Sequence, residues 1–84
     1  MYEIIFSDKF EKEFERLAPD FQKRIIKVLE RVRIRPFSYF KKLAGKDSYR
    51  LKVGQYRIIA DIDNNKLMIL LLKLGHRKNI YDKI

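Results

Sequence analysis

Hydrophobic positions in the first part of the chain repeat at helical spacing after one short β-prone run. The run Tyr2–Phe6 (YEIIF) favours a strand, and Ser7 after it is a residue type that caps helices. Phe10, Phe14 and Leu17 then recur at positions i, i+4 and i+7, with charged residues between them. This pattern predicts a strand followed directly by an amphipathic helix.

A second helix is expected to begin at Pro19, because proline is favoured at the first position of a helix. Its apolar residues again form one stripe, and Arg35-Pro36 predicts its end. Only one or two residues separate the two helices, so they should pack as an antiparallel hairpin. The apolar stripe consists of Phe21, Ile25, Val28, Leu29 and Val32.

Apolar and polar residues alternate in the second half of the chain, which is typical of half-buried strands. The alternation covers Tyr49–Val53 and Tyr56–Ile62. Gly54-Gln55 between them suits a two-residue type II′ hairpin turn, since glycine readily adopts the positive φ that the first position requires. These segments therefore predict a tight β-hairpin.

The remaining segments complete the expected fold. Phe37–Lys46 is the least regular stretch and predicts a short strand with a turn closed by Gly45. Asp63–Lys66 (DNNK) predicts a second turn, and the run Lys66–Leu74 is apolar on both faces, which predicts a central strand covered on both sides. Residues 1–84 are thus expected to form a single α+β domain, with an N-terminal strand, an antiparallel helical hairpin and a twisted antiparallel sheet.

Composition excludes several kinds of chemistry. The chain has no cysteine and one histidine, His76. Disulfides and thiolate metal sites are therefore excluded, and neither a zinc site nor any other cofactor is expected. No apolar run is long enough to cross a membrane, and acidic residues occur too early at the N-terminus for a secretory signal. We expect no membrane span and a cytoplasmic location.

The net charge of +9 is concentrated in one part of the chain. Residues 1–30 hold six Lys and Arg against seven Asp and Glu, whereas residues 31–84 hold fourteen against four. A local surplus of this size is typical of a phosphate-binding surface. The alternative is a lysine-rich surface that serves only solubility.

Three basic residues are expected to share one face of the predicted hairpin. With Gly54-Gln55 as its loop, Lys52 lies directly opposite Arg57, and Arg50 lies two residues along on the same face. Like charges opposed across a ladder work against folding, and a bound phosphate would relieve the repulsion. Long side chains that splay into water are the alternative.

The three side chains suit different chemical roles. Lys52 is the one that can lose a proton, so it is the candidate base, while Arg50 and Arg57 suit phosphate contacts. Ribonucleases need a base for the 2′-hydroxyl, charge stabilisation at phosphorus and an acid for the 5′-oxygen. His76 is a candidate for acid–base work or a phosphate contact. Tyr81 is a candidate for base stacking or for a hydrophobic anchor.

The chain resembles the RelE/ParE toxin superfamily over essentially its whole length. The segments SYRLKVGQYRIIADID and LMILLLKLGHRKNIY carry this resemblance. It implies the toxin of a type II toxin–antitoxin pair, bound by a small acidic antitoxin in a hetero-oligomer. In the RelE branch it also implies a metal-independent endoribonuclease that cuts mRNA in the ribosomal A site. The 2′-hydroxyl attacks the adjacent phosphate and leaves a cyclic phosphate.

The resemblance also assigns roles to individual positions. It places a proposed base at Lys52, a basic strand residue at Arg50 and a transition-state contact at Arg57. Arg77 corresponds to a phosphate contact or leaving-group acid, with His76 as the other acid candidate. Tyr81 corresponds to the residue that stacks on the mRNA base, although its spacing from Arg77 departs from RelE. The expected RNA-binding residues are Arg50, Lys52, Arg57, Arg77 and Lys78.

Two alternatives to the ribonuclease remain open: a ParE-like toxin that acts on DNA gyrase, and a non-catalytic RNA- or ribosome-binding module. A further expectation concerns the last predicted strand. If Arg57 lies opposite Leu72 and Ile59 opposite Leu70, an apolar row with Met68 lies on the cationic side of the sheet. That row would need cover from the C-terminal segment, through Ile80 and Ile84, or from the antitoxin.

Overall fold

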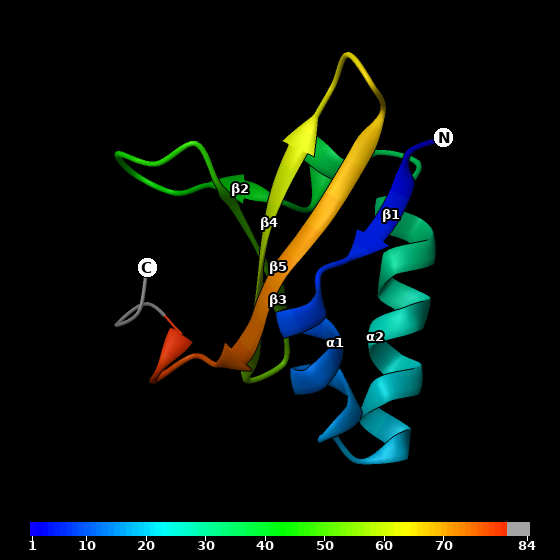
Figure 1. The fold of residues 1–84 in the computed structure, drawn as a ribbon, viewed down its shortest axis with the longest axis vertical. Coiled ribbons are helices and arrows are strands. Elements are labelled where there is room, and N and C mark those ends of the chain that lie inside the picture. Colours follow the sequence, from blue (N-terminus) through cyan, green and yellow to red (C-terminus); the bar gives the residue numbers. More distant parts are fainter. Residues whose placement is uncertain (81–84) are drawn as a thin grey trace.

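A computed structural model describes residues 1–80, which form two helices and a five-stranded sheet (Figure 1). The expected strand, helical hairpin and following strands are all present, which confirms the α+β class. In chain order the elements are β1 (Glu3–Phe6), α1 (Asp8–Glu15), α2 (Pro19–Val32), the 3₁₀ turn η1 (Pro36–Ser38), β2 (Lys41–Lys42), β3 (Tyr49–Val53), β4 (Tyr56–Asp63) and β5 (Met68–His76).

The sheet has the order β1-β5-β4-β3-β2, and the strands that follow the helical hairpin are antiparallel as expected. The pairs from β2 to β5 are antiparallel, but β1 runs parallel to β5, with Glu3 opposite Met68 and Phe6 opposite Leu71. No hairpin joins β1 to β5, so turn geometry does not set their direction. β1 leads directly into α1, and its parallel direction carries α1 along the edge of β5.

Helix α1 takes the place of a strand along the second half of β5. Ser7 N–H donates to Leu71 O at 3.0 Å, and Ser7 Oγ donates to Leu72 O at 3.1 Å. Further along, Glu13 Oε1 accepts from Leu74 N at 3.0 Å. Ser7 Oγ also accepts from Phe10 N, which confirms it as the helix cap. Backbone groups of β5 that lack a strand neighbour are thus satisfied.

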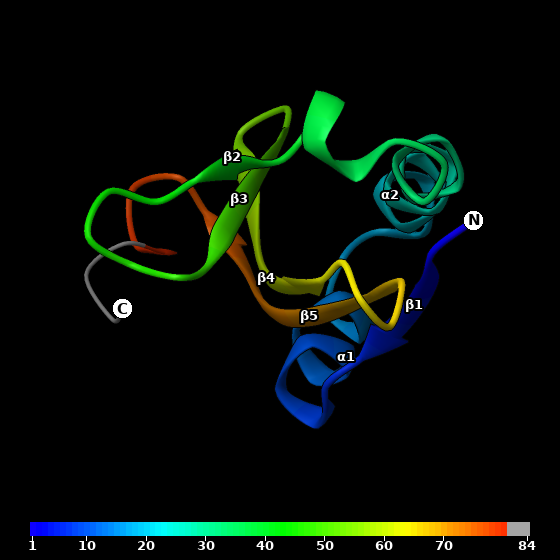
Figure 2. The ribbon, with the colours of Figure 1, turned by 90° about the horizontal axis from the view of Figure 1, so that it is seen from above.

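The main core lies between the helices and one face of the curved sheet. Helix α2 lies on the concave side of the sheet (Figure 2), and α1 and α2 run in opposite directions (Figure 1), as the predicted hairpin requires. Pro19 begins α2 as expected, and Ile25, Leu29 and Val32 from its apolar stripe are buried. They pack in one cluster with Phe10, Phe40, Leu51, Val53, Ile58, Ala60, Ile69, Leu71 and Leu74.

The register between β4 and β5 differs from the expected one. Asp63 pairs with Met68, so the turn takes the four residues between them, with Leu67 at a φ of 53°. Asp63 Oδ1 accepts from the N–H groups of Asn65 and Lys66, which stabilises this wider turn. The register then shifts again between Ile59 and Ala60, where a β-bulge adds a residue to β5.

Because of these two register shifts, the expected pairing that defined the apolar row on β5 is wrong. Arg57 lies opposite Gly75 rather than Leu72, and Ile59 lies opposite Lys73 rather than Leu70. β5 is central, but it is covered on both faces only near its end, where the Ile80 side chain packs against Gly75. Met68 and Leu70 remain half-exposed among the described residues.

Candidate functional site

The hairpin β3–β4 has the register that the sequence predicted. Val53 lies opposite Tyr56, and Lys52 lies opposite Arg57. Arg50 lies opposite Ile59, so the three predicted basic residues share the face that points away from the main core. The expected convergence of Arg50, Lys52 and Arg57 is therefore present in the fold.

Two further lysines join this face, and the sequence analysis missed both. Lys41 of β2 lies opposite Arg50, and Lys73 of β5 lies opposite Ile59. Pairing the short strand in Phe37–Lys46 with β3 would have found Lys41. Lys73 could not have been found, because the bulge moves it into this row. We call the set Lys41, Arg50, Lys52, Arg57 and Lys73 the cationic face.

An apolar residue lies in the middle of the cationic face. Ile59 is only 2% exposed, although it points away from the main core, and it is not part of the main core cluster. Ile80 is 5% exposed, and its Cδ1 lies 3.0 Å from where a Cβ on Gly75 would be. Gly75 is therefore a position where the absence of a side chain lets the C-terminal turn approach the sheet. A buried apolar floor lowers the local dielectric and strengthens the pull of neighbouring cations on an anion.

The Gly54-Gln55 turn holds the guanidinium of Arg57. Gly54 has a φ of 60°, and Gln55 is not among the positive-φ residues, as a type II′ turn requires. Nη1 of Arg57 donates to both Gly54 O and Tyr56 O at 2.9 Å. Together these two bonds use both protons of Nη1, so the Nε–Nη2 edge of the guanidinium is left to bind a phosphate.

The same turn anchors the start of the C-terminal segment. Arg77 N–H donates to Gln55 O at 2.8 Å, so the backbone of Arg77 lies beside the turn that holds Arg57. Arg77 and Lys78 are exposed. Tyr81, the candidate stacking residue, and Ile84 lie outside the described residues.

His76 lies on the other side of the sheet from Lys52 and Arg57. It pairs with Tyr56, and their rings meet edge to face at 5.8 Å, while Tyr56 also packs against Phe21 of α2 at 4.9 Å. His76 Nδ1 accepts from Lys78 N at 3.2 Å, so a neutral His76 ring carries its proton on Nε2. The fold thus groups Arg77 with the cationic face through the turn, and it groups His76 with Tyr56.

Metal ligands do not gather in the part of the chain that the structure describes. Within residues 1–80 there is no group of three or more His, Cys, Asp or Glu side chains that could hold a metal ion. Among the same residues, no helix is both long enough and apolar enough to cross a membrane.

The sequence matches the family model for the ParE toxin of the type II toxin–antitoxin system parDE over residues 4–81. The chain belongs to the ParE toxin family. This family is part of the RelE/ParE superfamily, so the toxin class expected from the two sequence segments is confirmed. A comparison with curated proteins finds no matching sequence.

Solved structures with this fold include toxins in complex with their antitoxins. The RelBE2 complex of Mycobacterium tuberculosis matches with a TM-score of 0.83 and 19% identity, over 90% of this chain and 98% of that chain. The intact RelBE complex of Escherichia coli matches with a TM-score of 0.78 and 23% identity, over 90% of this chain and 96% of that chain. The RelB–RelE complex of Methanococcus jannaschii matches with a TM-score of 0.71 and 27% identity, over 95% of this chain and 98% of that chain. This ParE-family toxin therefore has the fold of RelE toxins.

Proposed function

We propose that this toxin is a metal-independent endoribonuclease that cuts mRNA on the ribosome and so blocks translation. The observation that carries the proposal is the cationic face, where Lys52 lies opposite Arg57 beside the turn that anchors Arg77. Five bases around a buried isoleucine form a surface suited to a phosphodiester with its extra transition-state charge.

The proposed reaction assigns one role to each of these side chains. Lys52 Nζ takes the proton of the ribose 2′-hydroxyl, whose oxygen attacks the adjacent phosphorus. Arg57 and Arg50 stabilise the added negative charge, and the bond to the 5′-oxygen breaks, leaving a 2′,3′-cyclic phosphate. The leaving oxygen needs a proton, and Arg77 is our candidate donor because it lies beside the turn. Tyr81 is proposed to stack on the mRNA base.

Dependence on the ribosome follows from the weakness of this acid–base set. A lysine and arginines on an open face give little orientation to a flexible RNA, so alignment of the reacting atoms must come from elsewhere. We expect negligible cleavage of free RNA and codon-positioned cuts on translating ribosomes. Primer extension on mRNA in a translation mixture measures both.

Controls separate this proposal from its rivals. Intact programmed ribosomes are first isolated and transferred to a buffer that keeps them assembled. The mRNA cuts should persist when EDTA is then added. Efficient cutting of naked RNA contradicts ribosome dependence. Ribosome binding without cuts supports a non-catalytic module instead.

The histidine and the arginine at the end of β5 should differ in importance. We expect Arg77→Ala to lower the rate of mRNA cleavage by about 10²-fold or more, because the charge beside the turn is lost. We expect His76→Ala to change that rate by less than about tenfold, since His76 faces Tyr56. Single-turnover cleavage on programmed ribosomes measures both rates, and the opposite ranking would assign the acid to His76.

A second function deserves a direct test because the matching family is named for ParE toxins. A ParE-like toxin would act on DNA gyrase and would not need Lys52 as a base. Supercoiling by purified gyrase in the presence of the toxin measures this activity. Inhibition of gyrase together with uncut mRNA would replace the ribonuclease proposal.

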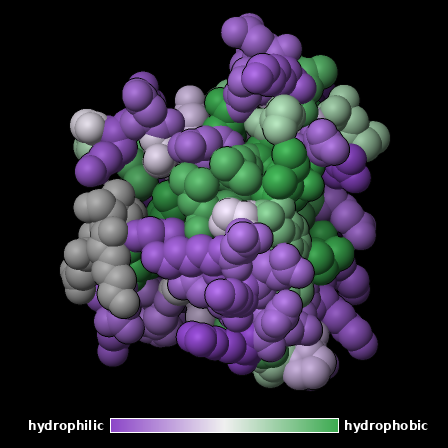
Figure 3. All heavy atoms as spheres, viewed as in Figure 1, coloured by the Kyte–Doolittle hydropathy of each residue, from purple (hydrophilic) through white to green (hydrophobic). Residues whose placement is uncertain are grey.

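We also propose where the antitoxin binds. Ile5 of β1 pairs with Leu70 of β5 on the face that points away from α2, and Met68 lies on the same face. All three side chains are half-exposed, and Figure 3 shows an apolar patch over this part of the sheet, bordered by polar side chains. An acidic antitoxin segment that covers Ile5, Met68 and Leu70 would extend toward the bases of the cationic face and block RNA from it.

A further inference from the structure

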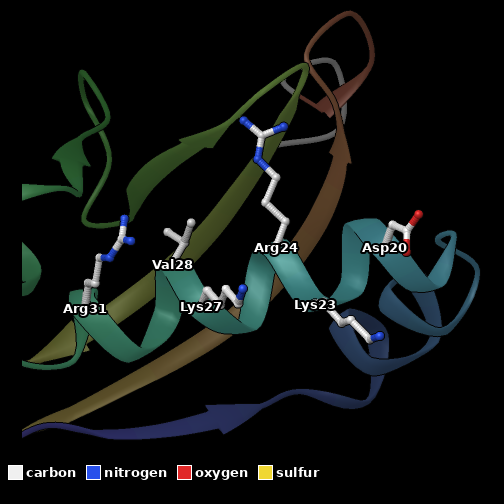
Figure 4. Close-up of a pocket in the computed structure, with 6 residues that line it drawn as sticks. All are labelled: Asp20, Lys23, Arg24, Lys27, Val28 and Arg31. Atoms are coloured by element: carbon white, nitrogen blue, oxygen red, sulfur yellow. The ribbon is translucent and has the colours of Figure 1, made fainter.

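Helix α2 carries a second cluster of bases, away from the cationic face. Lys23, Arg24, Lys27 and Arg31 line an open hollow of about 530 Å³, together with Val28 and Asp20 (Figure 4). All four bases are exposed, and one acid accompanies them. In Figure 4, Arg24, Val28 and Arg31 point from α2 toward the side of the β3–β4 hairpin. From Lys23 to Arg31 the bases extend about 12 Å along the helix axis.

Helix α2 also borders an apolar groove beside these bases. Phe14, Ile26 and Glu30 line this groove, and Lys23 and Lys27 line both the groove and the hollow. The strip of bases continues beyond the helix, because Arg31 also lines a hollow with Arg35 and Tyr39. Tyr39 is 44% exposed, so its ring is open to solvent in this hollow. We call Lys23, Arg24, Lys27, Arg31 and Arg35 the α2 basic strip.

One end of the α2 basic strip reaches the turn that holds Arg57. A Cβ on Gly54 would lie 3.3 Å from Arg24 Nη1, so the guanidinium of Arg24 packs against this turn. Gly54 O also accepts from Arg57 Nη1. Arg24 and Arg57 therefore approach the same glycine from α2 and from the cationic face. The turn connects the two basic surfaces.

We propose that the α2 basic strip binds the phosphate backbone of single-stranded RNA, with Tyr39 stacking on an unpaired base at the far end. An acidic peptide fits less well, because protein partners need apolar area to bury and Val28 is the only apolar residue that lines the larger hollow. Phosphates need only positive charge, and an exposed aromatic beside a basic groove is the arrangement by which proteins hold single strands. This binding site does not depend on the proposed cleavage.

The test measures how salt weakens RNA binding by full-length toxin. A fluorescein-labelled single-stranded RNA of 12 nucleotides is titrated in the Arg57→Ala background, which further slows any cleavage of free RNA during the measurement. Lys27→Gln with Arg31→Gln should reduce the slope of log K against log salt by about 1.4, since each phosphate contact contributes about 0.7 for single strands. The control Lys12→Gln with Lys66→Gln removes the same charge from exposed positions outside the strip and should leave the slope unchanged. Tyr39→Ala should weaken binding by about fivefold or more.

Three results would overturn the proposal. Equal changes of slope in the strip and control variants would mean diffuse attraction by net charge. Duplex RNA that binds as tightly as the single strand, with no effect of Tyr39→Ala, would exclude the single-strand site. Displacement of the RNA by a poly-glutamate peptide of equal charge at equal concentration would mean a surface for any polyanion. Each readout is binding, so the result stands whether or not the toxin cleaves mRNA.

Discussion

Toxin carrying Lys52→Ala or Arg57→Ala is expected to lose growth inhibition and to cut mRNA at least about 10²-fold more slowly than the unmodified protein. Lys52→Ala removes the proposed base, and general-base catalysis contributes about 10²- to 10⁴-fold. Arg57→Ala removes the guanidinium that the Gly54-Gln55 turn holds in place, and the loss of one such charge contact costs a similar factor. Induced expression in cells and single-turnover cleavage on programmed ribosomes measure these effects.

The fold should survive both substitutions. Lys52 is exposed and Arg57 is half-exposed on the face away from the main core, so no core cavity forms. Removing one of two opposed charges should leave the melting temperature unchanged or slightly higher. Lys66→Ala, in the exposed turn between β4 and β5, is the matched control and should remain fully toxic. Full toxicity of both Lys52→Ala and Arg57→Ala would contradict the proposed site.

Leu70→Glu is expected to prevent neutralisation of the toxin by its antitoxin while toxicity is kept. Leu70 lies at the centre of the apolar patch, with Ile5 beside it on β1. A carboxylate there would be buried without a partner when the antitoxin binds, which weakens binding by several kcal/mol. Surface plasmon resonance with the cognate antitoxin measures the affinity, and co-expression in cells measures neutralisation.

A matched substitution outside the patch keeps this prediction specific. Ile34→Glu introduces the same charge at a position that is already 60% exposed after α2, and it should leave antitoxin affinity unchanged. Because apolar burial should dominate the affinity, salt should slow association steeply and change dissociation little. Tight binding of the Leu70→Glu toxin would place the antitoxin on another surface.

Much of this fold follows from local sequence signals. Ser7 and Pro19 mark the starts of α1 and α2, because capping and the fixed φ of proline act within a few residues. The register of the β3–β4 hairpin also follows from sequence, since the loop Gly54-Gln55 is too short to permit another pairing. That register alone places Lys52 opposite Arg57, so the centre of the candidate site was predictable.

Other features depend on contacts between segments far apart in the chain. The parallel direction of β1 is set by its docking against β5, because no tight turn links them. The wide turn after Asp63 and the bulge beside Ala60 shift β5 by steps that no short motif encodes, and they place Lys73 and Gly75 on the cationic face. The tertiary structure therefore decided which residues surround Lys52 and Arg57, and it placed His76 across the sheet from them. Sequence determined the helices, the strands and the tight hairpin, because these depend on neighbouring residues. Long-range packing determined the direction of β1, the register of β5 and the residues that surround the site.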